Sequence, residues 1–316
     1  MKKRALIDIG SNTVKILIAQ LSESAERKIL DQASLSCRLV PDFSQISTTI
    51  PIQSKNRLIE CINQFKTLLI KWQVDEVKMV GTEAFRKAQN AEDVVHSILT
   101  ETGLTLEILS GTQEAQAVAD GLLHDPNLCD RKSFIALDLG GGSLELLEFK
   151  EGRTIELKSL PLGAIAVAGR SGLSLIEPIP TKTTKKLKKE VHECLDQQAG
   201  VFKNSNLHLV GCGGTLVFLR QIIEQSLQPK SPGQICYSDA NDIYKHISAL
   251  SLKERFSYFP KLPTDRADIF PYGLLVLLST MQFLGKDLLI HSFYNLRHGL
   301  IFNEDHQQTT TQLKTK

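Results

Sequence analysis

Two separate stretches of this chain follow one pattern: an apolar run, a short loop of small residues and a second apolar run. The first reads ALIDIGSNTVKILIAQ over residues 5–20, and the second reads IALDLGGGSLELLEFK over residues 135–150. The aligned pairs are Asp8 with Asp138, Gly10 with Gly140, Thr13 with Ser143, and Lys15 with Glu145. Two β-rich runs around a tight turn predict a β-hairpin, and an internal repeat predicts two copies of one domain type.

Both hairpin loops have the composition of a phosphate-binding loop. Successive backbone N–H groups in a loop of small residues can point into one concavity that binds an anion, and glycine permits the close approach and the positive φ that such a loop needs. The acid that ends each first strand, Asp8 or Asp138, is a hard oxygen ligand for Mg²⁺ or its water shell. A tight turn without a ligand would explain one such loop, but two copies favour phosphate.

A third glycine loop, residues 211–215, lies between a predicted strand and a predicted helix. A phosphate placed there would meet the N–H groups at a helix N-terminus, where the macrodipole also favours negative charge. Close packing of the strand on the helix is the alternative for this loop.

Two further segments contain candidate functional side chains. In residues 82–90, Thr82 can cap a helix, and Arg86 could bind phosphate with its planar guanidinium group. Spacing alone favours an arginine on a solvated face, where most such arginines lie. Glu114 lies in the first turn of a predicted helix, where the dipole favours a carboxylate. The functional alternative for Glu114 is a general base directed at a water molecule.

The composition is that of a globular protein without a nucleic-acid or membrane partner. The chain has 316 residues, of which 42% are hydrophobic and 23% charged, and this length suggests about two domains. A formal net charge of +2 is too small to indicate nucleic acid or an anionic membrane. No window approaches the roughly 20 apolar residues of a membrane span, and residues 1–10 do not resemble a signal sequence. We therefore expect a cytoplasmic protein.

The cysteines and the basic residues suggest no further site. No two of the six cysteines have CxxC spacing, so neither zinc nor a redox pair is indicated, and we expect reduced thiols. The basic run KTTKKLKK, residues 182–189, follows a predicted loop over 178–184. Its simplest interpretation is the solvated face of a helix, and attraction of polyanions is the alternative.

Taken in order, these motifs resemble the exopolyphosphatase / guanosine pentaphosphate phosphohydrolase family, within the actin-like ATPase and sugar-kinase superfamily. The resemblance spans nearly the whole chain. The matching pieces are DIGSNTVKILI (8–18), GTEAFRKAQN (81–90), ILSGTQEA (108–115), LDLGGGSLEL (137–146), SLPLGA (159–164), GCGGTL (211–216), DRADIFPYGLLVL (265–277) and NLRHGLI (295–301).

The resemblance implies an α/β fold with two RNase H-like domains and an active site in the cleft between them. Residues 1–122 would form the first domain and residues 123–300 the second, with a C-terminal helix over 301–316 packing back on the first. Longer family members continue into a helical phosphohydrolase-like domain, so this chain resembles the short form. The resemblance leaves a homodimer open.

The resemblance also implies roles for individual residues. Glu114 falls on the catalytic glutamate of the SGxEEA-type motif, which orients and deprotonates the attacking water. Asp138 and Glu145 fall on the acids of DxGGGSxE, which hold Mg²⁺ or another divalent cation, and Asp8 is the matching acid of the first domain. The residues implied to bind phosphate are Gly10, Ser11, Asn12, Thr13, Lys15, Arg86, Gly140, Gly141, Gly142, Ser143, Gly213, Gly214 and Thr215.

Four positions depart from the family pattern. Lys15 stands in place of an arginine and loses its bidentate geometry. The others are Gln113 for a frequent glutamate, Ala166 for a common arginine after LPLGA, and His298 for the glutamate of LREG. These departures leave the implied catalytic and metal-binding acids in place. The properties on which they bear are chain-length preference, recognition of the guanosine nucleotide and turnover.

The expected function is hydrolysis of a terminal phosphoanhydride, in inorganic polyphosphate or in guanosine pentaphosphate. Phosphoryl transfer depends mainly on positioning and on neutralisation of charge. Here the loops, Mg²⁺, Lys15 and Arg86 would neutralise charge, and Glu114 would activate water. A kinase or ATPase of the same superfamily and a non-catalytic binder of polyphosphate or alarmone remain as alternatives.

Overall fold

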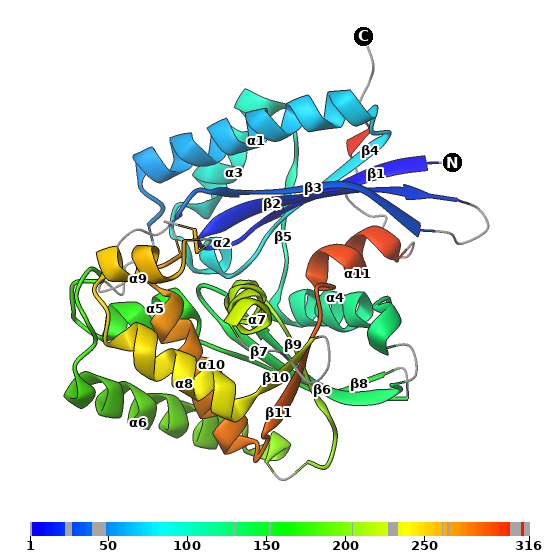
Figure 1. Cartoon of the computed structure of the whole chain (residues 1–316). Coiled ribbons are helices and arrows are strands. Elements are labelled where there is room, and N and C mark those ends of the chain that lie inside the picture. Colours follow the sequence, from blue (N-terminus) through cyan, green and yellow to red (C-terminus); the bar gives the residue numbers. More distant parts are fainter. Residues whose placement is uncertain are drawn as a thin grey trace. The chain divides into compact units, whose positions relative to one another are not determined.

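The computed structural model describes residues 2–22, 27–39, 49–128, 131–151, 153–203, 205–226, 233–260, 262–263, 266–303 and 311–312 (Figure 1). The chain forms two compact units. Unit 1 consists of Met1–His124 and Tyr294–Lys316, and unit 2 of Asp125–Phe293. In the part of the chain described, no helix is both long and apolar enough to cross a membrane.

Unit 1 contains a six-stranded mixed sheet with the order β12-β4-β1-β2-β3, and β5 pairs with β4. The strands are β1 Lys2–Ile9, β2 Thr13–Leu21, β3 Arg27–Ser36, β4 Glu76–Gly81, β5 Leu106–Ile108 and β12 Thr311–Gln312. β1, β2 and β3 form an antiparallel meander, whereas β4 is parallel to β1 and β5 is parallel to β4. The predicted hairpin of β1 and β2 is confirmed.

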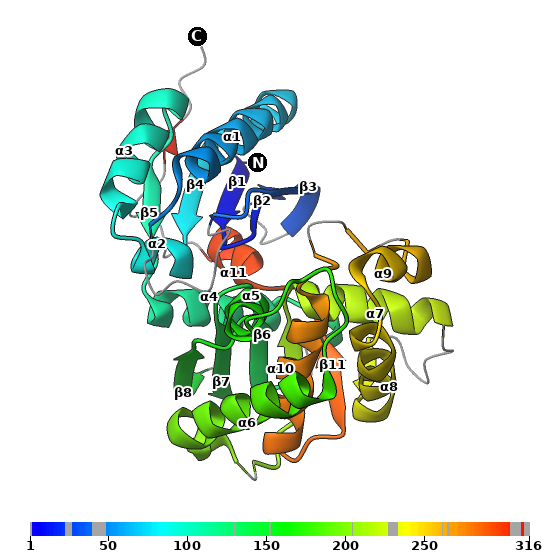
Figure 2. The ribbon, with the colours of Figure 1, turned by 90° about the vertical axis from the view of Figure 1, so that its left-hand side faces the viewer.

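Helices cover both faces of this sheet, which explains why its central strands are apolar almost throughout. The helices of unit 1 are α1 Ile52–Trp72, α2 Glu83–Lys87, α3 Ala91–Thr102, α4 Gly111–Leu123 and α11 Leu296–Phe302. Ile7 and Ile9 of β1 belong to the core cluster that also holds Phe65 of α1 and Ile98 of α3. Figure 2 shows α1 and α3 on one side of the sheet and α11 on the other.

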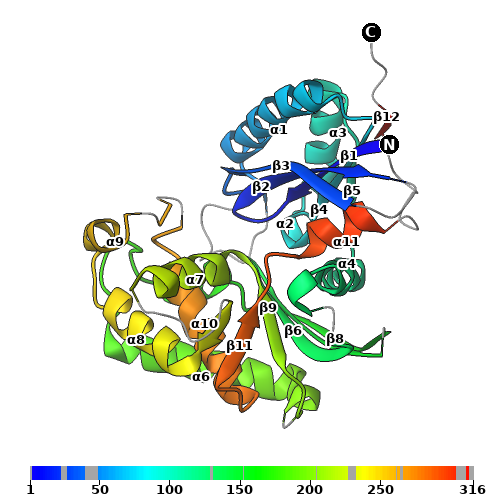
Figure 3. The ribbon, with the colours of Figure 1, turned by 45° about the vertical axis from the view of Figure 1, so that its right-hand side comes forward.

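The last described helix, α11, packs directly against α4 (Figure 3). The two helices approach so closely that a Cβ at Gly121 would lie 2.0 Å from the Asn295 carbonyl oxygen, and one at Gly299 would lie 2.0 Å from the Ala117 carbonyl oxygen. The helix expected over 301–316 instead begins at Leu296, because Asn295 caps it, and ends at Phe302. Thr311–Gln312 form a strand against β4, and residues 304–310 and 313–316 of the expected helix lie outside the described residues.

Unit 2 contains a second six-stranded sheet, with the order β10-β11-β9-β6-β7-β8. Its strands are β6 Ser133–Leu139, β7 Leu144–Lys150, β8 Arg153–Leu160, β9 Leu209–Cys212, β10 Gln234–Cys236 and β11 Leu288–His291. Again three consecutive strands, β6, β7 and β8, form an antiparallel meander, and the next strand, β9, is parallel to the first. The predicted repeat therefore corresponds to one topology present twice.

The helices of unit 2 surround α10, which is buried nearly all round, as expected for a helix at the centre of a domain. They are α5 Ala164–Arg170, α6 Thr181–Gln198, α7 Gly214–Ser226, α8 Tyr237–Ser248, α9 Leu252–Tyr258 and α10 Phe270–Phe283, with the short 3-10 helices η1 Pro126–Leu128 before β6 and η2 Gly200–Phe202 after α6. α10 packs on α5, α6 and α8, whereas α7 packs on β6, β9, β10 and β11. The expected loop over 178–184 is shorter, because α6 already begins at Thr181.

Candidate active site

The first hairpin places Asp8 and Lys15 directly opposite each other in the β1–β2 register. Directly opposite residues in an antiparallel pair lie on the same face of the sheet. The loop between them is closed by a hydrogen bond from the Gly10 N–H to the Thr13 carbonyl oxygen at 3.0 Å. The N–H groups of Cys37 and Leu39, which follow β3, donate to the Asn12 and Ser11 carbonyl oxygens at 3.1 and 2.9 Å. Backbone bonds from two sides therefore fix this loop.

The second hairpin loop is fixed in a different way, by the N-terminus of α5. The carbonyl oxygens of Gly140 and Gly141 accept hydrogen bonds from the N–H groups of Ala164 and Ile165 at 3.1 and 2.8 Å. Gly163 allows this approach, because a Cβ there would lie 2.2 Å from the Gly141 carbonyl oxygen. Across the described residues, no backbone carbonyl accepts from the N–H of Gly141, Gly142 or Ser143. Three successive N–H groups of small residues can together bind an anion.

The glycines of the two hairpin loops do not adopt the positive φ that their composition predicted. Among the described residues of the three loops, only Gly213 has a positive φ, +107°. A Cβ on Gly10 or Gly140 would also meet its nearest neighbour at an ordinary 3.5 or 3.4 Å. The hairpin loops close instead through the Gly10–Thr13 and Gly140–Ser143 hydrogen bonds, so the prediction for these glycines was wrong.

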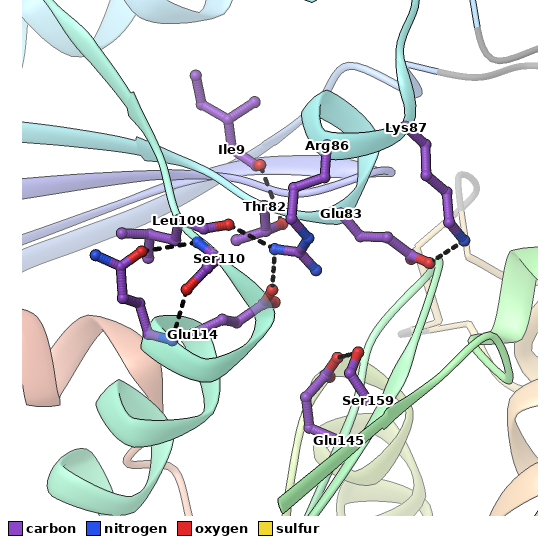
Figure 4. Close-up of polar contacts among 11 residues, drawn as sticks. Ile9, Thr82, Glu83, Arg86, Lys87, Leu109, Ser110, Glu114, Glu145 and Ser159 are labelled. Carbon is purple, nitrogen blue, oxygen red and sulfur yellow. Dashed lines mark hydrogen bonds and ion pairs between the residues drawn. The ribbon is translucent and has the colours of Figure 1, made fainter. Parts of the chain in front are cut away.

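The second hairpin places two carboxylates opposite each other, Asp138 on β6 and Glu145 on β7. Glu145 is only 2% exposed, and its Oε1 accepts a hydrogen bond from the Ser159 hydroxyl at 2.9 Å (Figure 4). Like charges directly opposite are destabilising, so a cation would stabilise this pair. The described residues contain no group of three or more His, Cys, Asp and Glu side chains that could hold a metal. Two facing carboxylates are the kind of ligand set that Mg²⁺ uses, since it keeps several waters and binds through one or two carboxylates together with substrate phosphates.

The third loop joins β9 to α7. Because β9 is parallel to β6, Cys212 lies beside Asp138, and the chain then turns at Gly213 into a helix that begins at Gly214. A Cβ on Gly213 would lie 2.4 Å from the Leu139 carbonyl oxygen. This loop therefore packs against the end of β6, and Thr215 lies in the first turn of α7, where N–H groups favour an anion.

In unit 1 the corresponding turn after β4 leads to an ion pair between Arg86 and Glu114. The Arg86 Nη1 lies 2.7 Å from the Glu114 Oε2 and also donates to the Leu109 carbonyl oxygen at 2.8 Å. Figure 4 shows the guanidinium group between these two acceptors. Glu114 is 9% exposed. The sequence identified both residues but gave no sign that they form a pair.

Glu114 owes its position to the capped N-terminus of α4. The Ser110 hydroxyl accepts from the Gln113 N–H at 3.2 Å, and the Gln113 Oε1 accepts from the Ser110 N–H at 2.8 Å. This reciprocal pair is a capping box. Gln113, a departure from the family pattern, therefore has a structural role that a glutamine performs as well as a glutamate.

The same explanation applies to His298, which stands in place of a glutamate at the third position of α11. Its ring Nδ1 accepts a hydrogen bond from the Asn295 N–H at 3.2 Å, and the Asn295 side chain accepts from the Arg297 N–H at 3.1 Å. Burial, followed by the charge of Arg297, lowers the pKa of His298 to about 3. His298 is therefore a neutral capping residue.

Thr82 does not cap α2 through its side chain, contrary to the prediction. Its hydroxyl donates instead to the Ile9 carbonyl oxygen at the end of β1, at 3.4 Å. This bond exists because β4 is parallel to β1 and ends beside it. Sequence reasoning also missed two residues near the predicted ones. Ser159, the first residue of SLPLGA, holds Glu145, and Glu83 pairs with Lys87.

The sequence profile of the Ppx/GppA phosphatase family matches residues 20–308. The chain belongs to this family. Among curated proteins, one from Haemophilus influenzae described as "Putative exopolyphosphatase" is 22% identical over 309 residues, which cover 96% of this chain and 91% of that protein.

Solved structures of Ppx/GppA proteins share the fold. The Aquifex aeolicus Ppx/GppA enzyme has a TM-score of 0.77 and 25% identity, with 96% of this chain and 99% of that chain covered. An exopolyphosphatase from Cytophaga hutchinsonii has a TM-score of 0.84 and 20% identity, with 95% and 97% covered. The two sheets with their repeated topology match the two-domain, actin-like α/β fold of these Ppx/GppA structures, and the predicted fold class is confirmed.

Proposed function

We propose that this member of the Ppx/GppA family is an exopolyphosphatase that releases the terminal phosphate of inorganic polyphosphate. The observation that carries the proposal is the pair of Glu114 and Arg86 at 2.7 Å, at the capped start of α4. A carboxylate held in place by a guanidinium group and a helix start can orient a water molecule and accept its proton. The descriptions of the relatives from Haemophilus influenzae and Cytophaga hutchinsonii support the same substrate.

In the proposed reaction, Glu114 accepts a proton from a water molecule whose oxygen attacks the terminal phosphorus. The bond from that phosphorus to the bridging oxygen breaks, and the products are orthophosphate and a chain shorter by one unit. Arg86, through the guanidinium nitrogens that do not contact Glu114, would neutralise charge on the transferred group. Such a step requires little covalent chemistry from the protein and depends on positioning and electrostatics.

The phosphate loops would hold the remaining charge of the substrate. In unit 2, three successive N–H groups, those of Gly141, Gly142 and Ser143, accommodate an anion, and the start of α7 offers a second anion site. Asp138 and Glu145 would hold Mg²⁺, which supplies positive charge against the phosphate oxygens. In unit 1, Lys15 would supply an ammonium group.

The proposal is tested with Glu114→Gln, which keeps the shape of the side chain and removes its basicity. We expect kcat for polyphosphate to fall by about 10²–10⁴, whereas polyphosphate still binds. Glu92→Gln is the matched control, because Glu92 also lies in the first turn of a helix, α3, and is exposed. Full activity of Glu114→Gln would refute the assignment.

The same assay separates the alternative substrates. Phosphate release is measured from long-chain polyphosphate and from guanosine pentaphosphate, side by side, with and without Mg²⁺. Faster turnover of guanosine pentaphosphate would show that this nucleotide, and not polyphosphate, is the preferred substrate. Tight binding of either compound without release would identify a non-catalytic binder.

A further inference from the structure

The N-terminal half of α6 presents a stripe of lysines on the outside of unit 2. Lys182, Lys185, Lys186 and Lys189 follow one another at intervals of three, one and three residues, which places them on one helix face, and all four are exposed. The opposite face, Leu187, Val191 and Leu195, is buried. Figures 1 and 2 show α6 at the periphery of unit 2.

The charges of α6 are arranged against the dipole of the helix. Acids stabilise a helix near its N-terminus and bases near its C-terminus. In α6 the first half, Thr181–Lys189, contains five lysines and no acid, whereas the second half contains the acids Glu190, Glu193 and Asp196 and no lysine. Its N-terminus also has no side-chain cap. Local rules that favour stability are usually broken where function requires it.

Ion pairs within α6 offset only part of the destabilisation that this order of charges causes. The Nζ atoms of Lys186 and Lys189 lie 3.7 Å from the Oε1 atoms of Glu190 and Glu193, respectively. In both pairs the lysine precedes the glutamate, and this order stabilises a helix less than the reverse order. Lys182 and Lys185 take part in no ion pair that the structure gives among its described residues. Each of them is four residues before another lysine, a spacing at which like charges repel.

The stripe fits a linear chain of phosphates better than other polyanions. Its four ammonium groups extend over about 10 Å of helix, in a single row. Sites for single-stranded nucleic acid add aromatic side chains for base stacking, but Thr181–Gln198 contains no Phe, Tyr or Trp. The apolar face of α6 lies in the core of unit 2, so none of it remains to enter a lipid surface.

We propose that the lysine stripe of α6 is a second polyphosphate-binding surface, which holds the part of a long chain that has not reached the catalytic residues. The proposal rests on the proposed function for its choice of polyanion. It assigns to Lys182, Lys185, Lys186 and Lys189 a role in affinity for long chains and none in the chemical step.

The test is the fourfold variant K182Q/K185Q/K186Q/K189Q. We expect KM for long-chain polyphosphate to rise by about tenfold or more at low salt, and the slope of log affinity against log salt to fall by about 3. KM and kcat for tripolyphosphate stay unchanged, because the proposal gives the stripe a role only in affinity for long chains. The variant unfolds at the same or a higher denaturant concentration, since the removed charges oppose the dipole. The control variant K28Q/K71Q/K245Q/K253Q removes four exposed lysines from β3, α1, α8 and α9 and should leave both substrates unaffected.

Binding of fluorescent long-chain polyphosphate to Glu114→Gln, with and without the stripe, measures the same effect without turnover. If the wild-type protein releases no phosphate and binding still depends on the stripe, the surface is supported while the exopolyphosphatase assignment is refuted. The inference would be overturned by any of three results. The affinity for long chains could stay unchanged, the affinity for tripolyphosphate could fall equally, or RNA or anionic vesicles, but not polyphosphate, could bind in a stripe-dependent way.

Discussion

Replacing Gly213 tests how strictly the third loop depends on its backbone. Gly213 has a φ of +107°, and a Cβ there would lie 2.4 Å from the Leu139 carbonyl oxygen and 2.9 Å from the Asp138 Oδ1. Gly213→Ala thus combines two effects. A non-glycine residue in a sparsely populated backbone region costs about 1–3 kcal/mol, and overlap with packed atoms costs about 1–3 kcal/mol. We expect the free energy of unfolding of unit 2 to fall by about 4 kcal/mol.

Two other glycines of unit 2 separate these effects. Gly172 also has a positive φ, +65°, but a Cβ there would meet nothing within 4 Å. Gly172→Ala should therefore show only the backbone effect, about 1–3 kcal/mol. Gly200 has neither a positive φ nor a neighbour within 4 Å, and Gly200→Ala should stay within about 1 kcal/mol of the wild type.

The measurement is urea unfolding followed by circular dichroism, with hydrogen exchange of β6 and β9 amides to assign the loss to unit 2. Gly213→Ala should also weaken phosphate binding, because a displaced loop no longer directs its N–H groups at the anion. The reasoning about close approach is refuted if Gly213→Ala unfolds at the same urea concentration as Gly172→Ala.

Three further predictions concern stability. His291 and His298 are buried, and their pKa values are lowered to about 3, so the unfolded state binds more protons than the folded state below pH 6.5. The free energy of unfolding should therefore fall as the pH drops from about 6.5 toward 3, by up to about 1.4 kcal/mol per pH unit for each histidine. His298→Gln should reduce this slope, measured by denaturation at several pH values. Ser110→Ala should destabilise α4 by about 1 kcal/mol, whereas Gln113→Glu should retain the wild-type stability in urea unfolding because glutamate also completes a capping box; equal stabilities of these two variants would contradict the cap. Gly299→Ala, whose Cβ would lie 2.0 Å from the Ala117 carbonyl oxygen, should lower the unfolding free energy of unit 1 by about 3 kcal/mol or more, and a wild-type thermal transition would show that α4 and α11 can move apart.

Patterns that act over a few residues were sufficient to predict much of the fold. Leu58, Ile62 and Phe65 have helical spacing and are all buried on α1, and the apolar runs on either side of a small-residue turn identified both hairpins. By contrast, short elements such as β10 and α9 lack a long periodic signal and were not predicted. Thr311–Gln312 could not be assigned to a strand, because that strand exists only through its pairing with β4.

By itself, the sequence determined which residue types the candidate site contains: the paired acids and loops of a repeat, the glutamate of α4 and the arginine after β4. Only the tertiary structure decided how they are held. Arg86 and Glu114 are 28 residues apart, Ser159 reaches Glu145 across the β7–β8 pair, and Gly213 has its special backbone conformation because it packs against the end of β6. The reason is physical: a local pattern reports on neighbours along the chain, whereas these contacts form only after strand pairing brings separate segments together. The pairing is parallel for β4 with β5 and for β6 with β9, and antiparallel for β7 with β8.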